Sequence, residues 1–415
     1  MRVRTALGAL GERPFRLLWL GQTLSAAGDA VVGVAIAFAV LELGDARDLG
    51  FVMACYMLPR ALLTLAGGVW ADRLPRRLVM IGADLVRAIA QATAAVLLIG
   101  GTAETWQLAV TSALVGTGSA FFGPASSGLV PETISPGRLQ DANALMGVSR
   151  NGVEVFGPLV AGVLVATAGP GWVLAIDAAS YLASVVFLAL LPRGVAPALL
   201  HRSFVGDLVE GFREVRSRTW LWSGFLVFCV GNTATAAAFV LGPTVAKAEL
   251  GGAAAWGLIV AGGAVGATVG SALALRLRPE RPLLLAFPVI CLVGVQLLAF
   301  VPPLPVGAIM LTAAAGFGAI ALANALWETT VQEHVPREAL SRVTAYDWLI
   351  SFVCMPLGYV LAGPAAAAVG VGTTFAACAA LVVAANLLVL LVPGVRTLRR
   401  VVRAPHEREP ALEAA

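Results

Sequence analysis

The chain is poor in charge, and above all in lysine and histidine. Asp, Glu, Lys and Arg make up 13% of its 415 residues, which is about half the share of an ordinary soluble domain. Hydrophobic residues make up 59%, and Gly, which membrane helices tolerate better than soluble ones, occurs 45 times. Lys247 is the only lysine. These proportions exclude an ordinary soluble domain and predict a membrane protein.

Motifs of catalysis and of nucleotide binding are also missing. His201, His334 and His406 are the only histidines and are far apart, and the HExxH, GxSxG and P-loop patterns do not occur. We therefore expect neither an enzyme nor an ATP-driven pump, and no cofactor or metal site. The arginines are scattered among short segments, which argues against nucleic-acid binding. The cysteines lie in apolar runs without metal-ligand spacing, and we interpret all five as small hydrophobic residues: Cys55, Cys229, Cys291, Cys354 and Cys378.

Twelve apolar runs are long enough to cross a bilayer as helices. A helix needs about 20 mostly apolar residues to span roughly 30 Å of hydrocarbon. The first run is too long for a cleavable signal peptide and is followed by many others. We predict spans near 16–41, 49–70, 78–100, 107–129, 142–167, 172–191, 220–245, 256–276, 283–301, 305–327, 344–367 and 373–393.

The basic residues alternate between the segments that join these spans. Of the 28 basic residues, Arg60, Arg87 and Arg150 lie within spans, and only Arg47 and Lys247 fall in segments on the side opposite the N-terminus. Short cytoplasmic loops carry an excess of Lys and Arg. The pattern predicts a multi-pass protein of the cytoplasmic (inner) membrane with both termini in the cytoplasm.

The two halves of the sequence resemble each other at an offset of about 200 residues. GGVWADR at 67–73 corresponds to GSALALR at 270–276, and VPETISPGRL at 130–139 corresponds to VPREAL at 335–340. Between the halves, a stretch with apolar residues at helical spacing predicts an amphipathic helix on the inner membrane surface. We expect a six-helix half at 1–192, a cytoplasmic linker at 193–219, a second half at 220–395 and a basic, disordered tail at 396–415.

Several of these motifs resemble one transporter family. GGVWADRLPRR (67–77) is similar to the signature loop between the second and third helices of the major facilitator superfamily, and GPLVAG (157–162) to the antiporter motif of its drug-efflux members. FFGPASSGLVPE (121–132) and VPREALSRVTAYDW (335–348) resemble its macrolide-efflux branch. The resemblance implies an all-α membrane protein of twelve transmembrane helices in two six-helix pseudo-repeats, with the substrate site at the midplane between them. Its antiporter-motif residues would be Gly157, Pro158 and Gly162.

The resemblance also implies a gating latch on the cytoplasmic side. In relatives, the residue matching Asp72 meets the start of the eleventh helix, here near 341–345, where a carboxylate is favoured by the helix dipole. The alternative is a loop whose charges only set orientation. Leu275 replaces the aspartate in the second half, so we expect one latch. Its predicted residues are Gly67, Asp72, Arg73, Arg76 and Arg77, extended by an ion pair between Asp84 and Arg87, for which a proton relay is the alternative.

Ionisable residues inside spans are the candidates for proton coupling. Such residues are costly in the bilayer and usually face a cavity or a partner. Glu154 is our first candidate, with a fixed pair to Arg150 as its alternative, and Asp29 is the second, with a helix-packing hydrogen bond as its alternative. Arg60 is interpreted as an ion-pair partner of one of these acids. The fourth span lacks the arginine that family antiporters commonly carry there, so Arg60 or Arg150 would have to substitute, and Asp177 is given no role.

Function is predicted from these features together. We expect a monomeric secondary transporter that exports small amphipathic compounds by proton antiport. A dedicated exporter of one metabolite is the alternative, and a receptor or scaffold is the competitor from another class. The sequence does not identify the substrate or the coupling ion. Polar residues in or near spans are candidates for the cavity wall: Gln22, Asn143, Asn232 and Asn324.

Overall fold

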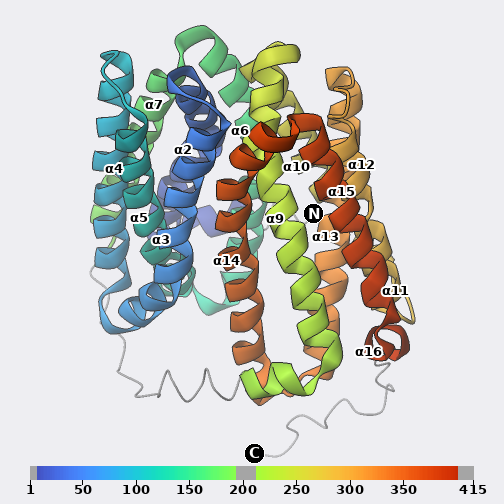
Figure 1. Ribbon diagram of the computed structural model, residues 1–415. Coiled ribbons are helices and arrows are strands. Elements are labelled where there is room, and N and C mark those ends of the chain that lie inside the picture. The colour runs from blue at the N-terminus through green and yellow to red at the C-terminus, as the bar shows by residue number, and fades with distance from the viewer. Residues whose placement is uncertain (1–6, 193–211, 401–415) are drawn as a thin grey trace, which may run out of the picture.

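The computed structural model is a bundle of long helices (Figure 1). It describes the backbone of residues 7–192 and 212–400, and the side chains of those ranges except at 7, 65–73, 136, 337–338, 341–342, 345 and 348–352. The helices are α2 (Arg13–Leu43), α3 (Ala46–Arg73), α4 (Arg76–Ile99), α5 (Thr105–Thr133), α6 (Leu139–Ala168), α7 (Pro170–Ala189), α9 (Thr219–Glu249), α10 (Ala253–Arg276), α11 (Pro282–Ile290), α12 (Leu292–Leu298), α13 (Val306–His334), α14 (Arg337–Val369), α15 (Val371–Leu388) and α16 (Pro393–Thr397), with short 3₁₀ turns η1 (Leu7–Gly11), η2 (Pro136–Arg138) and η3 (Val389–Leu391).

The predicted spans are confirmed as helices, with one difference. Nine helices of the described ranges are long and apolar enough to cross a membrane unaided. The predicted span 283–301 is wrong as a single helix, because it is divided into α11 and α12 at Cys291. Pro288 lies inside α11 and has no amide hydrogen, and the Cys291 amide bonds to its carbonyl oxygen at 3.1 Å in place of an α-helical partner. Proline within a helix removes one bond and crowds the preceding turn.

The internal repeat is visible in matching turns of the backbone. The turn between α6 and α7 passes through Gly169 at φ +86°, and the turn between α14 and α15 passes through Gly370 at φ +89°. These are the fifth-to-sixth connections of the two halves. Each turn needs a residue without a Cβ at a positive φ. The two halves therefore use a glycine in the same backbone conformation at positions 201 residues apart.

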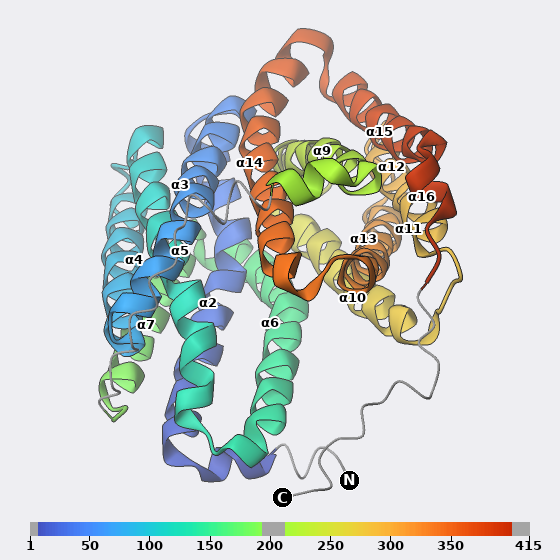
Figure 2. The ribbon, with the colours of Figure 1, turned by 90° about the horizontal axis from the view of Figure 1, so that it is seen from below.

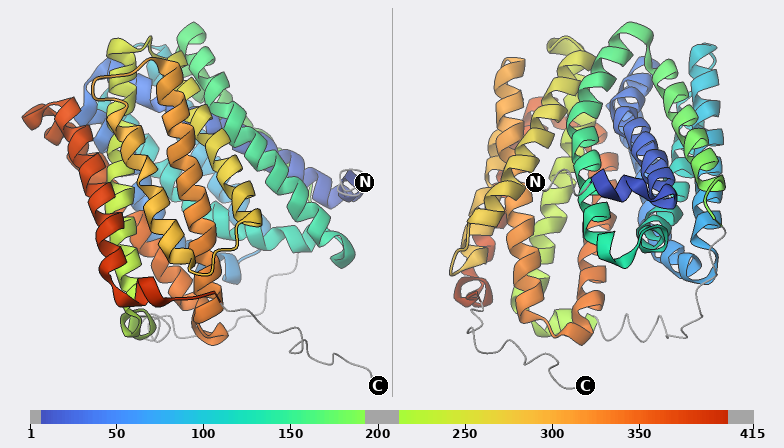
Figure 3. Two further views of the ribbon diagram at one scale, coloured as in Figure 1. Left: turned by 90° about the vertical axis from the view of Figure 1, so that its right-hand side faces the viewer. Right: turned by 180° about the vertical axis from the view of Figure 1, so that it is seen from behind.

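The helices form two groups that share a core at one end only. The N-terminal group contains α2–α7 and the C-terminal group α9–α15, and each packs mainly within itself. One cluster of buried apolar residues draws on both groups, for example Val34 and Val240. Where α2 begins, two separate clusters replace it, one around Phe15 and Met80 in the N-terminal group and one around Trp220 in the C-terminal group. The groups therefore diverge toward that end, which we call the divergent end, as Figures 1, 2 and 3 show.

The other end, where α2 ends and α3 begins, is called the closed end here. The groups meet at this end through α3 against α14 and α6 against α10. A Cβ on Gly257 would lie 2.3 Å from the carbonyl oxygen of Pro158, and one on Gly162 would lie 2.8 Å from that of Ala253. Lys247 donates a hydrogen bond to the carbonyl oxygen of Leu41 across the same boundary. Small residues thus let the backbones of the two groups touch.

The interpretation of all five cysteines as free hydrophobic residues is wrong for two of them. Cys229 of α9 and Cys354 of α14 form a disulfide, with their Cα atoms 5.3 Å apart. The hydroxyl of Thr233 also reaches the carbonyl oxygen of Cys354 at 3.3 Å, so the two helices are in close contact. A Cα separation of about 4.4–6.8 Å is what a disulfide requires. Cys55, Cys291 and Cys378 are free and partly buried.

The divergent end of the N-terminal group is tied by loop contacts. Glu12, which precedes α2, accepts hydrogen bonds from the hydroxyl of Ser135 at 2.6 Å and from its amide at 2.9 Å. The Ser135 hydroxyl and amide lower the pKa of Glu12, with a further contribution from Arg138.

Most of the predicted linker and tail lies outside the described residues. Residues 212–217 are helical, and Val215 among them is buried.

We expect Gly257→Val to loosen the closed end without unfolding the protein. The added side chain cannot fit against Pro158, and such overpacking costs about 1–3 kcal/mol, about a 5- to 150-fold change in the balance between conformations. Spin labels at the exposed Glu42 and Glu249 should report a longer distance across the closed end. Gly307→Val, where a Cβ has no neighbour within 4 Å, is the control. An unchanged distance in folded Gly257→Val protein would contradict the contact.

Candidate functional site

Polar side chains at helical spacing line three neighbouring helices of the N-terminal group. Residues at i, i+3 or i+4, and i+7 lie on one face of a helix. Helix α7 packs against both α2 and α4. We call this set the polar seam, and it consists of Gln22, Ser25 and Asp29 of α2, Asp84, Arg87 and Gln91 of α4, and Asp177, Ser180, Tyr181 and Ser184 of α7.

Arg87 is the centre of the seam. Its guanidinium group forms an ion pair with Asp84 and lies 3.6 Å from a carboxylate oxygen of Asp29. The rings of Phe122 and Tyr181 flank it, each with its centroid 4.3 Å from the central carbon. The Arg87 side chain is only 3% exposed. A buried cation is thus held by two carboxyl groups and two aromatic faces, which attract it through their quadrupoles.

Asp29 connects the seam to the outside of the group. Its side chain is 46% exposed, although it touches the buried Arg87. The hydroxyl of Tyr181 donates to Oδ1 of Asp29, and the guanidinium of Arg87 faces Oδ2. Both oxygens therefore face donors, which is the arrangement that an ionised carboxylate requires.

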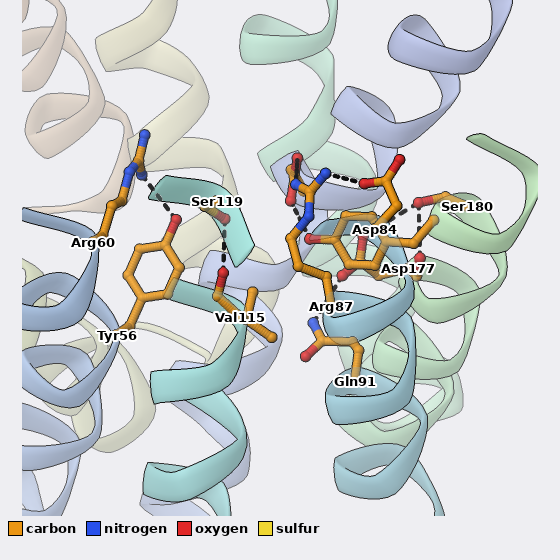
Figure 4. Close-up of polar contacts among 11 residues, drawn as sticks. Tyr56, Arg60, Asp84, Arg87, Gln91, Val115, Ser119, Asp177 and Ser180 are labelled. Atoms are coloured by element: carbon orange, nitrogen blue, oxygen red, sulfur yellow. Dashed lines mark hydrogen bonds and ion pairs between the residues drawn. The ribbon is translucent and has the colours of Figure 1, made fainter. Parts of the chain in front are cut away.

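Asp177 is fully buried and has different partners (Figure 4). Its Oδ2 accepts a hydrogen bond from the side-chain amide of Gln91 at 2.8 Å. Its Oδ1 lies 3.3 Å from the hydroxyl of Ser180, which itself donates to the backbone carbonyl of Asp177 at 2.8 Å. The carboxyl also lies against α2, because a Cβ on Gly28 would be 2.3 Å from Oδ1. Its hydrogen-bond partners are uncharged.

Several seam atoms have no hydrogen-bond partner in the described part of the chain. They are Nε of Arg87, the hydroxyl of Ser25 and Nε2 of Gln22, whereas the Ser184 hydroxyl is placed to bond the Asp84 carboxyl. Buried polar groups are normally paired, and an unpaired one costs free energy. Three such atoms in one seam indicate a network with spare donors, so its hydrogen bonds can rearrange.

The charges of the seam do not balance. Asp29, Asp84 and Asp177 contribute three carboxyl groups, and Arg87 is the only cation among the seam residues. A buried carboxylate without a cationic partner is very costly, so such a group takes up a proton instead. In the described part of the chain no three His, Cys, Asp or Glu side chains are placed to share a metal ion. The seam is therefore a candidate site for the binding and release of protons.

The predicted pair of Asp84 and Arg87 is present, and Arg87 also faces Asp29 in the interior of the N-terminal group. The predicted extension toward the latch involves side chains at 65–73, which lie outside the described residues. Asp177, which the sequence analysis left without a role, lies in the same seam. The predicted ion pair of Arg60 with an acid is not found among the described side chains, where Arg60 donates to the hydroxyl of Tyr56 at 2.8 Å, apart from the seam (Figure 4).

The latch can be described only in part. Gly67 and the side chains of Asp72 and Arg73 fall in the segment 65–73, whose side chains lie outside the described residues. Arg76 bonds the carbonyl oxygen of Gly128 and forms an ion pair with Glu132, both at 2.8 Å, while Arg77 donates to the last carbonyl oxygens of α7. These contacts of the two arginines stay within the N-terminal group.

Glu154 and Arg150 form an ion pair at 2.9 Å on the surface of α6. Their side chains are 55% and 78% exposed, so neither belongs to the buried seam. Both readings of Glu154 from the sequence remain open, but the pair predicted as its alternative is present. Gly157 packs closely on Ala30 of α2, so the antiporter motif lies between α2 on one side and the contact with α10 on the other.

The candidate cavity residues lie on four different helices. Gln22 belongs to the seam, Asn232 is half-buried on α9, and Asn143 and Asn324 are exposed on α6 and α13. The sequence analysis missed Gln91, Asp177 and Tyr181 as site residues. Their signal was present as polar residues at i, i+3 or i+4, and i+7 in apolar helices, a pattern that α2, α4 and α7 all contain.

Removing the cation from the seam should destabilise the protein strongly. Breaking a buried ion pair costs about 3–5 kcal/mol, because the carboxylates that remain are uncompensated. We expect Arg87→Met to lower the melting temperature of the purified protein, and Arg87→Met with Asp84→Asn to restore part of the loss. Arg150→Met is the matched control, since an exposed pair contributes about 0–1 kcal/mol. If both single variants lost the same stability, the seam would not be the structural centre described here.

Known proteins share both the sequence pattern and the fold. The sequence model of the Major Facilitator Superfamily matches residues 18–358. The "Multidrug efflux pump Tap" of Mycolicibacterium fortuitum is 28% identical over 412 residues, covering 93% of this chain and 97% of the relative. The "Macrolide efflux protein A" of Streptococcus pyogenes is 26% identical over 217 residues, covering 51% and 54%.

Solved transporters have the same arrangement of helices. The nucleoside transporter NupG superposes with a TM-score of 0.75 at 14% identity, covering 91% of this chain and 99% of that one. A bacterial homologue of the iron transporter ferroportin, described as inward-facing, superposes with a TM-score of 0.69 at 19% identity, covering 91% and 97%. With the family matched over most of its length and the fold of these transporters, the chain belongs to the major facilitator superfamily.

Proposed function

We propose that this protein exports small amphipathic compounds, antibiotics among them, in exchange for protons. The support is the likeness over almost the whole chain to a multidrug efflux pump, together with the partial likeness to a macrolide efflux protein. The protein would act as a monomer in the cytoplasmic membrane. Its two six-helix halves, 1–192 and 220–395, would rock against each other and expose one substrate site to each side in turn.

The positive-inside pattern supports an orientation for this cycle. It places both termini, and with them the divergent end of the bundle, in the cytoplasm. The closed end, held by Gly257, Pro158 and Lys247, would then face outward. On this orientation the structure represents the inward-facing state, in which substrate enters from the cytoplasm or the inner leaflet. The latch at Asp72 would form only when the divergent end closes.

Asp29 carries the proposal of proton coupling. It is the seam carboxyl that is both half-exposed and in contact with the buried guanidinium of Arg87. Protonation of Asp29 would remove a charge that Arg87 and Tyr181 hold in place, whereas a cationic or polarisable substrate would favour the ionised form. A group whose charge state responds to both substrate and proton can couple their movements.

Arg87 also supplies the cation that the fourth span lacks. It reaches from α4 onto Phe122 of α5, the fourth transmembrane helix, and places its charge beside Asp29. The structure thus favours Asp29 with Arg87 over the exposed pair of Glu154 and Arg150 that the sequence analysis ranked first. Glu154, on the surface of α6, remains a candidate for a smaller contribution to proton coupling.

The proposal predicts proton release driven by substrate in inside-out vesicles. After energisation, adding ethidium or erythromycin should discharge the pH gradient reported by a dye in vesicles that contain the wild-type protein. Asp29→Asn should abolish this release, because its charge no longer changes, and Glu154→Gln, the matched control, should retain most of it. No release with any compound, with folded protein present, would contradict proton antiport. Loss in Glu154→Gln but not in Asp29→Asn would move the coupling site to α6.

A further inference from the structure

The burial and the partners of Asp177 indicate that its carboxyl group carries a proton. The side chain is fully buried. One carboxyl oxygen accepts from the Gln91 amide at 2.8 Å, and the other lies 3.3 Å from the Ser180 hydroxyl, which also donates to the backbone carbonyl of Asp177 at 2.8 Å. Both partners are uncharged, and the ion pairs of Arg87 go to Asp84 and Asp29. A buried carboxyl group without a cationic partner takes up a proton.

The position of Asp177 connects this buried proton to Asp29. Its carboxyl lies against the backbone of α2 at Gly28, directly beside Asp29 in the chain. Tyr181, one turn from Asp177 on α7, donates its hydroxyl to Asp29. A proton that leaves Asp177 can therefore pass to the half-exposed carboxylate, which is the only seam acid with an exposed side chain.

The seam can also accommodate the charge that would remain. An ionised Asp177 needs a donor, and the guanidinium of Arg87 keeps one unpartnered N–H at Nε. The hydroxyl of Ser25 has no partner either. If Arg87 turns from Asp29 toward Asp177 while the proton passes from Asp177 to Asp29, the net charge of the seam does not change during the transfer.

We propose that Asp177 carries a second transported proton, which leaves through Asp29 after substrate binds to the inward-facing protein. This inference rests on the proposed function, and it adds a residue to the coupling site. Both oxygens of Asp29 face donors in the state described here, so we assign the release of its own proton to an earlier step of the cycle. Substrate binding beside it would draw the second proton out of the seam, so that two protons enter for each molecule exported.

The test is the substrate gradient that a fixed pH difference sustains in proteoliposomes. With the membrane potential held at zero, each antiported proton multiplies the equilibrium ethidium ratio by about ten per pH unit. At a difference of one pH unit, we expect the ethidium concentrations on the two sides to differ about 100-fold with the wild type and about tenfold with Asp177→Asn. Asparagine keeps the shape and can satisfy both Ser180 and Gln91, so this variant should fold. Asp141→Asn on α6, outside the seam, is the matched control and should behave as wild type.

The outcomes separate this inference from the proposed function. A tenfold ratio in the wild type, or equal ratios in wild type and Asp177→Asn, would overturn the second proton while leaving proton antiport intact. No dependence on pH in the wild type would overturn antiport itself. Infrared difference spectra give an independent readout. Adding ethidium to wild-type protein should remove a carboxylic-acid band that Asp177→Asn lacks, whereas a permanently protonated, structural Asp177 would show no change.

Discussion

The buried guanidinium of Arg87 is the constraint on which the N-terminal group depends. An arginine at the centre of a membrane helix costs about 2.5–3.5 kcal/mol on insertion scales, and here carboxyl groups from α2 and α4 and two aromatic rings offset that cost. If α2 or α7 shifted by one turn, about 5.4 Å, the cation would lose Asp29 or Tyr181. The seam therefore holds the register of three helices as well as the charge. This is why the group can move as one body, whatever happens at its boundary with the other.

That boundary has a different chemistry. Where the two groups meet, the contacts are backbone against backbone at Gly257 and Gly162, with one cationic hydrogen bond from Lys247 to a carbonyl oxygen. Such contacts depend on close fit, and separating them leaves no buried carboxylate uncompensated. The interior of the group is held by ion pairs that are expensive to break, whereas the boundary is held by packing that can be exchanged for another arrangement. A protein that must alternate between two states needs this division.

The sequence predicted the elements well and the site only in part. Spans follow from local hydropathy, and the pair of Asp84 and Arg87 follows from the spacing within one helix. The partnership of Arg87 with Asp29 and the burial of Asp177 depend on how α2, α4 and α7 pack, over separations that no local pattern reports. Glu154 was ranked first because nearby glycine and proline residues make its helix deformable, yet its side chain is 55% exposed and lies outside the seam. The disulfide of Cys229 and Cys354 was missed for the same reason, since contact between α9 and α14 decides it.

The location of the seam inside one group has a consequence for coupling. A proton site between the groups would be taken apart and rebuilt in each cycle, and substrate would compete directly for its space. In the proposed cycle the seam keeps its internal contacts while the groups rock, and Asp29 is the seam carboxyl exposed at its edge. Substrate and proton can then compete through the charge of Asp29 without sharing the interior. Coupling in this arrangement depends on whether Arg87 remains committed to Asp29 or turns to the acids behind it, which is a choice among hydrogen bonds that the spare donors of the seam make possible.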